Sequence, residues 1–457
     1  MRTIDKEILR LAIPSILANI TIPLVGMVDI AVAGHLDSSA AALIGGISVG
    51  SLLFDMLYWN FGFLRAGTGG MTAQAYGRED WQDCRSLLLR GVGTALLISL
   101  ALIMIQWPFQ KLAFLIINCS DEVKSLALKY FYIRIWAAPA TLSLMALRGW
   151  FIGMQDSFSS MLTDLVVNGI NILASIFLAM GVPGTGFKGI GFSGIAWGTF
   201  IAQYTGLLVA TCIVLLKYRN ILLSRSEARM DSPVADGKTT PSHHFYAVNR
   251  DLFIRSLCLM AVYLAFTSIS ARFGDTLLAM CSVMMKLMMI FSFFTDGFAF
   301  AGEALTGRFI GMRSKERLSE TVRRTFVWSL GIGLLFVAVY YLTGNWMFSL
   351  MTSDKSVIES AGAFLGWLVL MPLIGCPAFT WDGIYIGATE TKILRNSTVG
   401  CLVAFFVVWF AGLLFKPQGN APVHLLFAAY YSHLIFRSVY LTVKYRSSIP
   451  ARITVSE

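Results

Sequence analysis

The sequence predicts an all-α membrane protein with twelve transmembrane helices, arranged in two six-helix lobes related by pseudo-twofold symmetry. Three observations lead to this prediction: the composition, the number of apolar spans and an internal repeat. Of the 457 residues, 56% are hydrophobic and only 14% are charged, against about 25% charged in a typical soluble domain. This composition excludes a soluble enzyme, a nucleic-acid-binding domain and a disordered chain. The long, continuous apolar runs also exclude an outer-membrane barrel, whose strands alternate over short segments.

The apolar spans were measured against the roughly 20 residues that a helix needs to cross the hydrocarbon core. The first six spans cover residues 8–34, 42–76, 86–117, 124–150, 158–181 and 190–216, and the last six cover 251–273, 277–310, 323–349, 357–386, 394–415 and 421–443. Between the two sets lies a polar stretch. The chain therefore divides into an amino-terminal lobe (1–216), a cytoplasmic linker (217–250) and a carboxy-terminal lobe with a cytoplasmic tail (251–457).

The distribution of lysine and arginine gives the orientation. Of the 36 basic residues, 26 lie in the head, the tail, the loops after even-numbered spans and the adjoining span ends, 7 lie in loops and span ends on the other side, and Arg65, Arg134 and Lys286 lie within spans away from their ends. Cytoplasmic loops carry the excess of positive charge, so we expect a multi-pass protein of the bacterial inner membrane with both termini in the cytoplasm. The same distribution explains the net charge of +10 without a nucleic-acid partner.

An internal repeat relates the two halves. Thr72–Gly77 returns as Thr306–Gly311, and Gly149–Gly153 returns as Gly383–Gly387, both with an offset of 234 residues. Both motifs follow even-numbered spans, so the halves have parallel topology. Two such halves favour a transporter with a central cleft that opens to either side by rocking. A duplicated scaffold without a transport role is the alternative.

Asp29 is the principal candidate for a functional residue. It lies in the first span, and no lysine or arginine occurs within fifteen positions of it. A charged side chain at bilayer depth is costly, and a carboxylate in apolar surroundings binds a proton more readily than one in water. We therefore expect Asp29 to be the proton-coupling residue. A purely structural hydrogen bond to a neighbouring helix is the alternative.

Three polar residues of the fifth span are expected to support it. Asn168, Asn171 and Ser175 have the i, i+3, i+7 spacing that places them on one helix face. Such a face can form a proton network with Asp29, or it can hold helices together through hydrogen bonds alone.

Other charged residues within the spans are expected to form gate or cavity ion pairs, or structural pairs that line a wet cavity: Asp55, Arg65, Lys286, Asp296 and Glu303. Asp382, at the end of the tenth span, is expected to cap a helix or contact a loop. The sequence has no metal-ligand spacing, no Gly-x-Ser-x-Gly and no Walker A motif. We therefore expect no cofactor, no metal site and no enzymatic activity, although an intramembrane enzyme and a passive channel stay as alternatives.

Three segments carry a resemblance to a known family. Val28–Leu36, Phe63–Gly77 and Asp382–Thr389 resemble the DinF branch of the MATE multidrug exporters, and the likeness extends over essentially the whole chain. It implies twelve helices in two lobes and export driven by a proton or sodium gradient, with Asp29 at the family's cation-coupling position. The family has an aspartate four residues after the fifth-span asparagine, whereas Ser175 follows Asn171 here. This departure favours protons over sodium.

The predicted function is multidrug efflux: a monomeric, proton-coupled antiporter that exports amphipathic, often cationic, organic compounds by alternating access. Its partners are small organic substrates, protons and membrane lipid. A sodium-coupled MATE exporter is one alternative. A lipid-linked oligosaccharide flippase of the related superfamily is another, but it would need a broad cationic cavity, and only Arg65, Arg134 and Lys286 lie within spans away from their ends.

Overall fold

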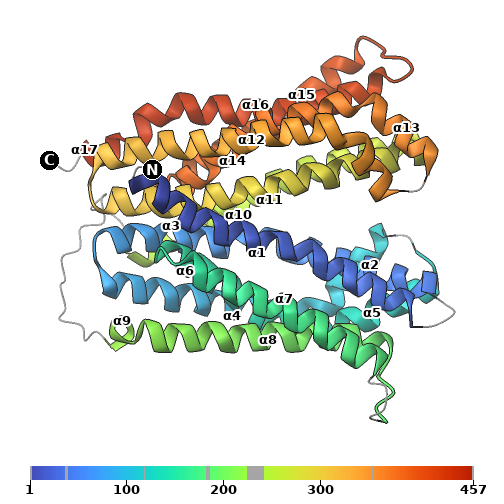
Figure 1. The fold of residues 1–457 in the computed structure, drawn as a ribbon, viewed down its shortest axis with the longest axis horizontal. Coiled ribbons are helices and arrows are strands. Elements are labelled where there is room, and N and C mark those ends of the chain that lie inside the picture. Colours follow the sequence, from blue (N-terminus) through green and yellow to red (C-terminus); the bar gives the residue numbers. More distant parts are fainter. Residues whose placement is uncertain are drawn as a thin grey trace. The chain divides into compact units, whose positions relative to one another are not determined.

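The computed structural model describes residues 3–36, 40–117, 119–181, 186–223, 241–352 and 354–454, and every regular element in these ranges is a helix (Figure 1). The first half contains α1 (Thr3–Gly34), α2 (Ala40–Tyr58), α3 (Phe63–Gly77), α4 (Trp81–Ile116), α5 (Asp121–Arg134), α6 (Ala138–Gly153), α7 (Ser157–Met180), α8 (Phe192–Lys217) and α9 (Arg219–Leu223). Single 3₁₀ turns join α2 to α3 (Trp59–Gly62) and α5 to α6 (Ile135–Ala137). The second and fourth expected spans therefore each consist of two helices.

The second half repeats this pattern with longer helices. It contains α10 (Pro241–Ser270), a 3₁₀ turn (Ala271–Phe273), α11 (Asp275–Gly311), α12 (Lys315–Met351), α13 (Lys355–Ala363), α14 (Leu365–Gly387), α15 (Thr391–Leu413), α16 (Ala421–Ser448) and α17 (Ala451–Thr454). The seventh span was expected to begin at residue 251, but α10 begins at Pro241. Residues 241–250 are helical but more polar than the span that follows, so hydropathy did not include them. Residues 224–240 of the expected linker lie outside the described residues.

The all-helical membrane fold is confirmed. Eleven helical segments of the described chain are long and apolar enough to cross a membrane. The twelfth expected span is present as α16, a helix of 28 residues. Its Arg437, two histidines and several tyrosines make it less apolar than the other eleven.

The contacts divide the chain into two compact units. The amino-terminal unit consists of Leu17–Thr72 and Glu79–Arg229, and in it α7 packs along α8, α2 along α5, and α4 along α6. The carboxy-terminal unit consists of Met1–Ile16, Ala73–Arg78 and Met230–Glu457, and in it α11 packs on α12 and α14, and α15 packs on α10 and α16. The start of α1 and the end of α3 thus pack with the second half of the sequence.

The internal repeat is visible in the backbone. The left-handed residues Glu79 (φ 57°) and Gln155 (φ 61°) have counterparts 234 positions later in Arg313 (φ 55°) and Thr389 (φ 53°). Each of the four residues follows the end of a helix. The two halves therefore form the same turn at two equivalent positions. The repeat thus extends from the sequence to the backbone conformation.

The repeated glycines explain how the helices of each half approach one another. A Cβ on Gly149 of α6 would collide with the carbonyl oxygen of Arg65 on α3, and a Cβ on Gly383 of α14 would collide with that of Ala299 on α11. Both pairs again differ by 234 residues. Only glycine permits this backbone contact, so the repeated motif encodes a helix crossing.

Candidate functional site

The centre of the candidate site is the carboxylate of Asp29 in the second half of α1. The side chain is buried, with only 6% of it exposed. The side chain of Ser175 on α7 neighbours the carboxylate, while Oδ1 has no hydrogen-bond partner among the described residues. An unsatisfied oxygen of a buried carboxylate is costly while the group is charged, and protonation removes that charge. The geometry therefore leaves one oxygen of Asp29 open to a proton.

The charge of Arg134 acts on Asp29 within the amino-terminal unit. Arg134 is the last residue of α5; its Nη1 donates a hydrogen bond to the Tyr130 hydroxyl at 2.9 Å, and its guanidinium lies 4.6 Å from the centre of the Phe54 ring. The sequence has no lysine or arginine within fifteen positions of Asp29, so its spacing did not reveal Arg134, which comes from α5, a separate part of the chain.

Two tyrosines and one acid complete the surroundings of Arg134. Tyr130 is fully buried on α5, and its hydroxyl interacts with both Arg134 and Asp29. Tyr58 and Asp55, both on α2, also interact with the charge of Arg134. The sequence analysis missed both tyrosines and the role of Arg134. The spacing of Tyr130 and Arg134, four residues apart on one helix face, was an available signal for a polar pair inside a span.

The polar face of α7 divides into two parts. The Ser175 hydroxyl donates to Asn171 Oδ1 at 3.2 Å, and Asn171 Nδ2 donates to Thr199 Oγ1 of α8 at 3.2 Å. Ser175 and Asn171 therefore extend the Asp29 site toward α8. Asn168 instead donates to Thr21 of α1 at 2.5 Å. It ties α7 to α1 two turns before Asp29 and lies outside the network around the carboxylate.

The residues expected to form gate or cavity ion pairs are distributed over both units. Asp55 is exposed and Arg65 half-buried in the amino-terminal unit. Lys286, Asp296 and Glu303 all lie on α11: Lys286 is exposed, Asp296 is half-buried and Glu303 is fully buried. Within the amino-terminal unit, the charge of Asp55 acts on Arg134. The role of all five residues as gate or cavity ion pairs stays a prediction.

Asp382 belongs to a buried ion cluster and does not act as a helix cap. Its Oδ2 accepts a hydrogen bond from Arg255 Nη2 of α10, and Arg437 Nη1 of α16 lies 3.3 Å from the same oxygen. Arg437 is only 2% exposed. The expectation of a cap or loop contact is wrong because Arg255 and Arg437 were counted with the cytoplasmic loops, whereas both side chains point into the helix bundle and converge on Asp382.

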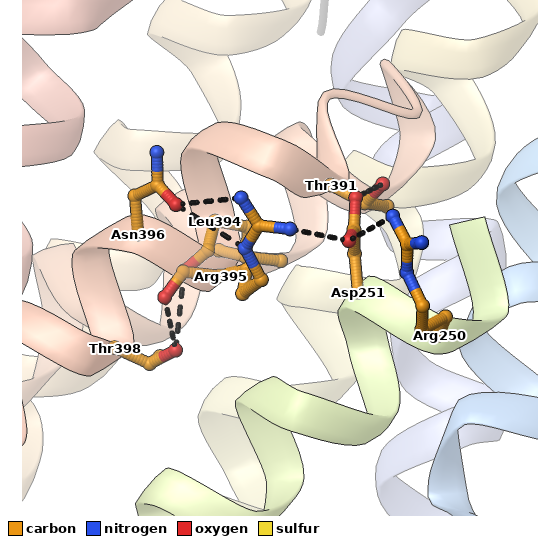
Figure 2. Close-up of polar contacts among 7 residues, drawn as sticks. All are labelled: Arg250, Asp251, Thr391, Leu394, Arg395, Asn396 and Thr398. Carbon is orange, nitrogen blue, oxygen red and sulfur yellow. Dashed lines mark hydrogen bonds and ion pairs between the residues drawn. The ribbon is translucent and has the colours of Figure 1, made fainter. Parts of the chain in front are cut away.

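A second polar cluster ties the first half of α10 to the start of α15 (Figure 2). Asp251 is buried, and its Oδ1 accepts a hydrogen bond from Arg395 Nη1 at 2.8 Å. Thr391 donates to Asp251 Oδ2 at 3.3 Å, and Arg250 Nη2 lies 3.6 Å from Oδ1 (Figure 2). These contacts hold α10 against the first turns of α15.

The turn between α6 and α7 has a comparable structural cluster. Asp156 is the N-cap of α7 and accepts hydrogen bonds from Ser159, Lys217 and Tyr218, the latter two at 2.7 Å. Burial acts to raise the pKa of Asp156, but these hydrogen bonds outweigh burial, so its pKa is lowered below the ordinary value. The carboxylate is therefore ionised at neutral pH and holds the ends of α7 and α8 together.

Among the described residues, no group of three His, Cys, Asp or Glu side chains could hold a metal ion. The features that could do chemistry in the described amino-terminal unit are thus the open oxygen of Asp29, the fixed charge of Arg134 and the hydroxyl groups around them. This arrangement can bind and release a proton, and it can attract one positive charge.

Comparison with known proteins agrees with the fold. The MatE family model matches residues 14–177 and 252–408, more than half of the chain. The chain is 34% identical over 445 residues to the DNA damage-inducible protein F of Escherichia coli (strain K12), covering 97% of this chain and 92% of that protein. It is 24% identical to a probable multidrug resistance protein NorM of Thermotoga maritima, with 90% and 84% covered.

The fold has solved counterparts. A crystal structure of a MATE protein in the bent conformation superposes with a TM-score of 0.83 at 16% identity, and the match covers 100% of this chain and 97% of that one. The family resemblance noted in the sequence is thereby confirmed. The chain belongs to the MatE family and is a multi-pass membrane transporter of the MATE type, not an enzyme.

Proposed function

We propose that this transporter exports amphipathic organic cations in exchange for protons, and that Asp29 is the residue at which the two compete. The observation that carries the proposal is the buried carboxylate, which has one oxygen open and the Ser175 side chain beside it. An ionised Asp29 attracts a cationic substrate, whereas a protonated one does not. Exposing the carboxylate to each side of the membrane in turn then exchanges one ligand for the other.

Protons are favoured over sodium by the surroundings of Asp29. A proton forms a covalent bond with the carboxylate and leaves a neutral group. The neighbouring positions of α7 supply an amide and a hydroxyl, Asn171 and Ser175, rather than a second acid.

The substrates proposed for this chain follow from the same charge. The Escherichia coli relative is named for induction by DNA damage and the Thermotoga relative as a probable multidrug resistance protein. Multidrug efflux is the function that agrees with both the family and an acidic, tyrosine-containing site. We propose that the protein is a monomer of the bacterial inner membrane. Both termini are proposed to lie in the cytoplasm, because the loops on that side carry the excess of basic residues.

Transport in proteoliposomes tests the proposal. Vesicles loaded with tetraphenylphosphonium are subjected to a pH jump or to a sodium jump, and release is followed with an ion-selective electrode. The wild type should respond to the pH jump alone, and Asp29→Asn should release no faster than protein-free vesicles. Asp121→Asn, an exposed acid in the first turn of α5, is the matched control and should behave as the wild type. Coupled release by Asp29→Asn, or release driven by sodium, would overturn the proposal.

A further inference from the structure

The helix pair formed by α10 and α15 carries two exposed positive charges at one end. These helices pack along one another in the carboxy-terminal unit, and as the seventh and eleventh spans they run in the same direction. Arg250 directly precedes the apolar part of α10, and Lys392 lies in the first turn of α15. Both side chains are exposed, that of Arg250 by 65%. Two cations thus lie where the apolar spans begin, at the depth of the lipid headgroups.

Helix register places the two cations on the same side of this pair. Thr391 of α15 donates to Asp251 Oδ2 of α10 at 3.3 Å, so these two positions face one another (Figure 2). Arg250 is the residue before Asp251, and Lys392 is the residue after Thr391. In a parallel helix pair, the position before a contact residue on one helix and the position after one on the other flank the same side, as the g and e positions of a coiled coil do. Arg250 and Lys392 can therefore bind one ligand together.

The nearby acids leave this side of the helix pair positive. Asp251 accepts a hydrogen bond from Arg395 at 2.8 Å, whereas Arg250 Nη2 lies 3.6 Å from the same oxygen, which is too long for a hydrogen bond (Figure 2). Glu390, the N-cap residue of α15, is half-buried and lies about 160° around the helix from Lys392 at 3.6 residues per turn. Neither acid is therefore placed to neutralise the exposed side of the pair.

An apolar stripe continues from each cation along its span. On α10, the exposed Leu257 lies seven residues after Arg250. On α15, the exposed Val399 and Val403 lie seven and eleven residues after Lys392. Spacings of seven and eleven residues return to the same helix face, and seven residues advance about 10 Å along the axis. The face thus has a basic end and an exposed apolar length, as a phospholipid has a charged headgroup and acyl chains.

We propose that this face is a binding site for one anionic phospholipid. Its phosphate would bind to Arg250 and Lys392, and an acyl chain would lie along Leu257 and Val399. Two cations attract a headgroup with a net negative charge, whereas a zwitterionic headgroup offers them no net charge. In the proposed orientation the site faces the cytoplasmic leaflet. The site does not involve Asp29, so its test is separate from that of the proposed function.

Thermal unfolding in a mild detergent tests the site. Phosphatidylglycerol and phosphatidylcholine with identical acyl chains are added in parallel, and a ligand that binds the folded state raises the unfolding temperature. The wild type should unfold several degrees higher with phosphatidylglycerol than with phosphatidylcholine, and Arg250→Gln/Lys392→Gln should lose most of that difference. Arg313→Gln/Lys315→Gln, at two exposed cations in the turn from α11 to α12, is the matched control and should keep it.

Three results would overturn the inference. One is a wild-type protein that responds equally to both lipids. Another is an Arg250→Gln/Lys392→Gln protein that loses no more of the difference than the control does. The third is stabilisation by glycerol 1-phosphate, a headgroup without acyl chains, to the same extent as by phosphatidylglycerol. Asp29→Asn should keep the lipid response while it loses transport, so failure of the lipid site and failure of the proposed function are distinguishable.

Discussion

Each unit of this transporter buries an aspartate that interacts with arginine, and the two groups differ in how the carboxylate is bound. In the amino-terminal unit, Arg134 gives its Nη1 hydrogen bond to Tyr130, and the Ser175 side chain lies beside the Asp29 carboxylate. In the carboxy-terminal unit, Arg255 and Arg437 converge on Oδ2 of Asp382. In both carboxylates Oδ1 has no hydrogen-bond partner among the described residues, so the difference lies in the ion pairs. A carboxylate bound by two guanidinium groups is expected to serve the structure, whereas Asp29 is proposed to exchange a proton.

The largest expected effect comes from removing the structural carboxylate. Asp382→Asn leaves the guanidinium groups of Arg255 and the buried Arg437 without a counter-charge, and breaking a buried ion pair in this way costs about 3–5 kcal/mol of unfolding free energy. Thermal unfolding in a mild detergent measures it. Asp275→Asn, at an exposed acid in the first turn of α11, should change the stability by less than about 0.5 kcal/mol. An Asp382→Asn protein as stable as this control would show that the cluster is not structural.

A smaller effect is expected at the repeated helix crossings. Gly149→Ala and Gly383→Ala each place a methyl group against a backbone carbonyl, and overpacking of this kind costs about 1–3 kcal/mol. The two costs should be similar, because the crossings are equivalent in the two halves. Gly331→Ala, on α12 with open space around its Cβ, is the control and should be neutral or stabilising. A loss in one half only would contradict the equivalence.

Asp156→Ala is expected to cost about 1–2 kcal/mol, since it removes the N-cap of α7 and the acceptor for Lys217 and Tyr218. The pKa of Asp156 is lowered in the folded protein. Its contribution is therefore complete above its unfolded pKa of about 4, and it is lost as the pH falls through the folded pKa.

A series of unfolding measurements between pH 7 and pH 3 should show this loss in the wild type and a flatter dependence in Asp156→Ala. Parallel curves for the two proteins would mean that another acid causes the loss of stability at low pH.

The smallest effect on stability is expected at Asp29. Asp29→Asn removes a buried charge with an unsatisfied oxygen and keeps the shape of the side chain, so the unfolding free energy should change by less than about 0.5 kcal/mol or should rise. Transport should be lost at the same time. The unfolding free energies of Asp29→Asn and Asp382→Asn therefore test the difference between the two sites directly. Equal destabilisation by the two variants would contradict that difference.

The sequence was sufficient to predict the fold because the features that determine it are local. Apolar runs define the spans, and the repeat of Gly149 as Gly383 was visible as an offset of 234 residues. The breaks of the second and fourth spans at Trp59–Gly62 and Ile135–Ala137 were not predicted, since hydropathy does not distinguish a 3₁₀ turn from an α-helix within an apolar run.

The candidate site was predicted only in part. Asp29, Asn171 and Ser175 could be found because each is a polar residue within an apolar span. Their partner Arg134 could not be assigned, because its approach to Asp29 depends on the packing of α5 in the unit and leaves no trace in the local pattern. Asp382 was misread for the same reason: its partners Arg255 and Arg437 come from α10 and α16, far away in the sequence.

Proton release on substrate binding tests the central claim most directly. Purified protein in weakly buffered detergent solution, near the pH at which transport is half-maximal, is mixed with tetraphenylphosphonium, and the released protons are counted with a pH indicator dye. If Asp29 exchanges a proton for the cation, the wild type should release up to about one proton per cation bound, and Asp29→Asn should release none. Equal release from both proteins would contradict the account.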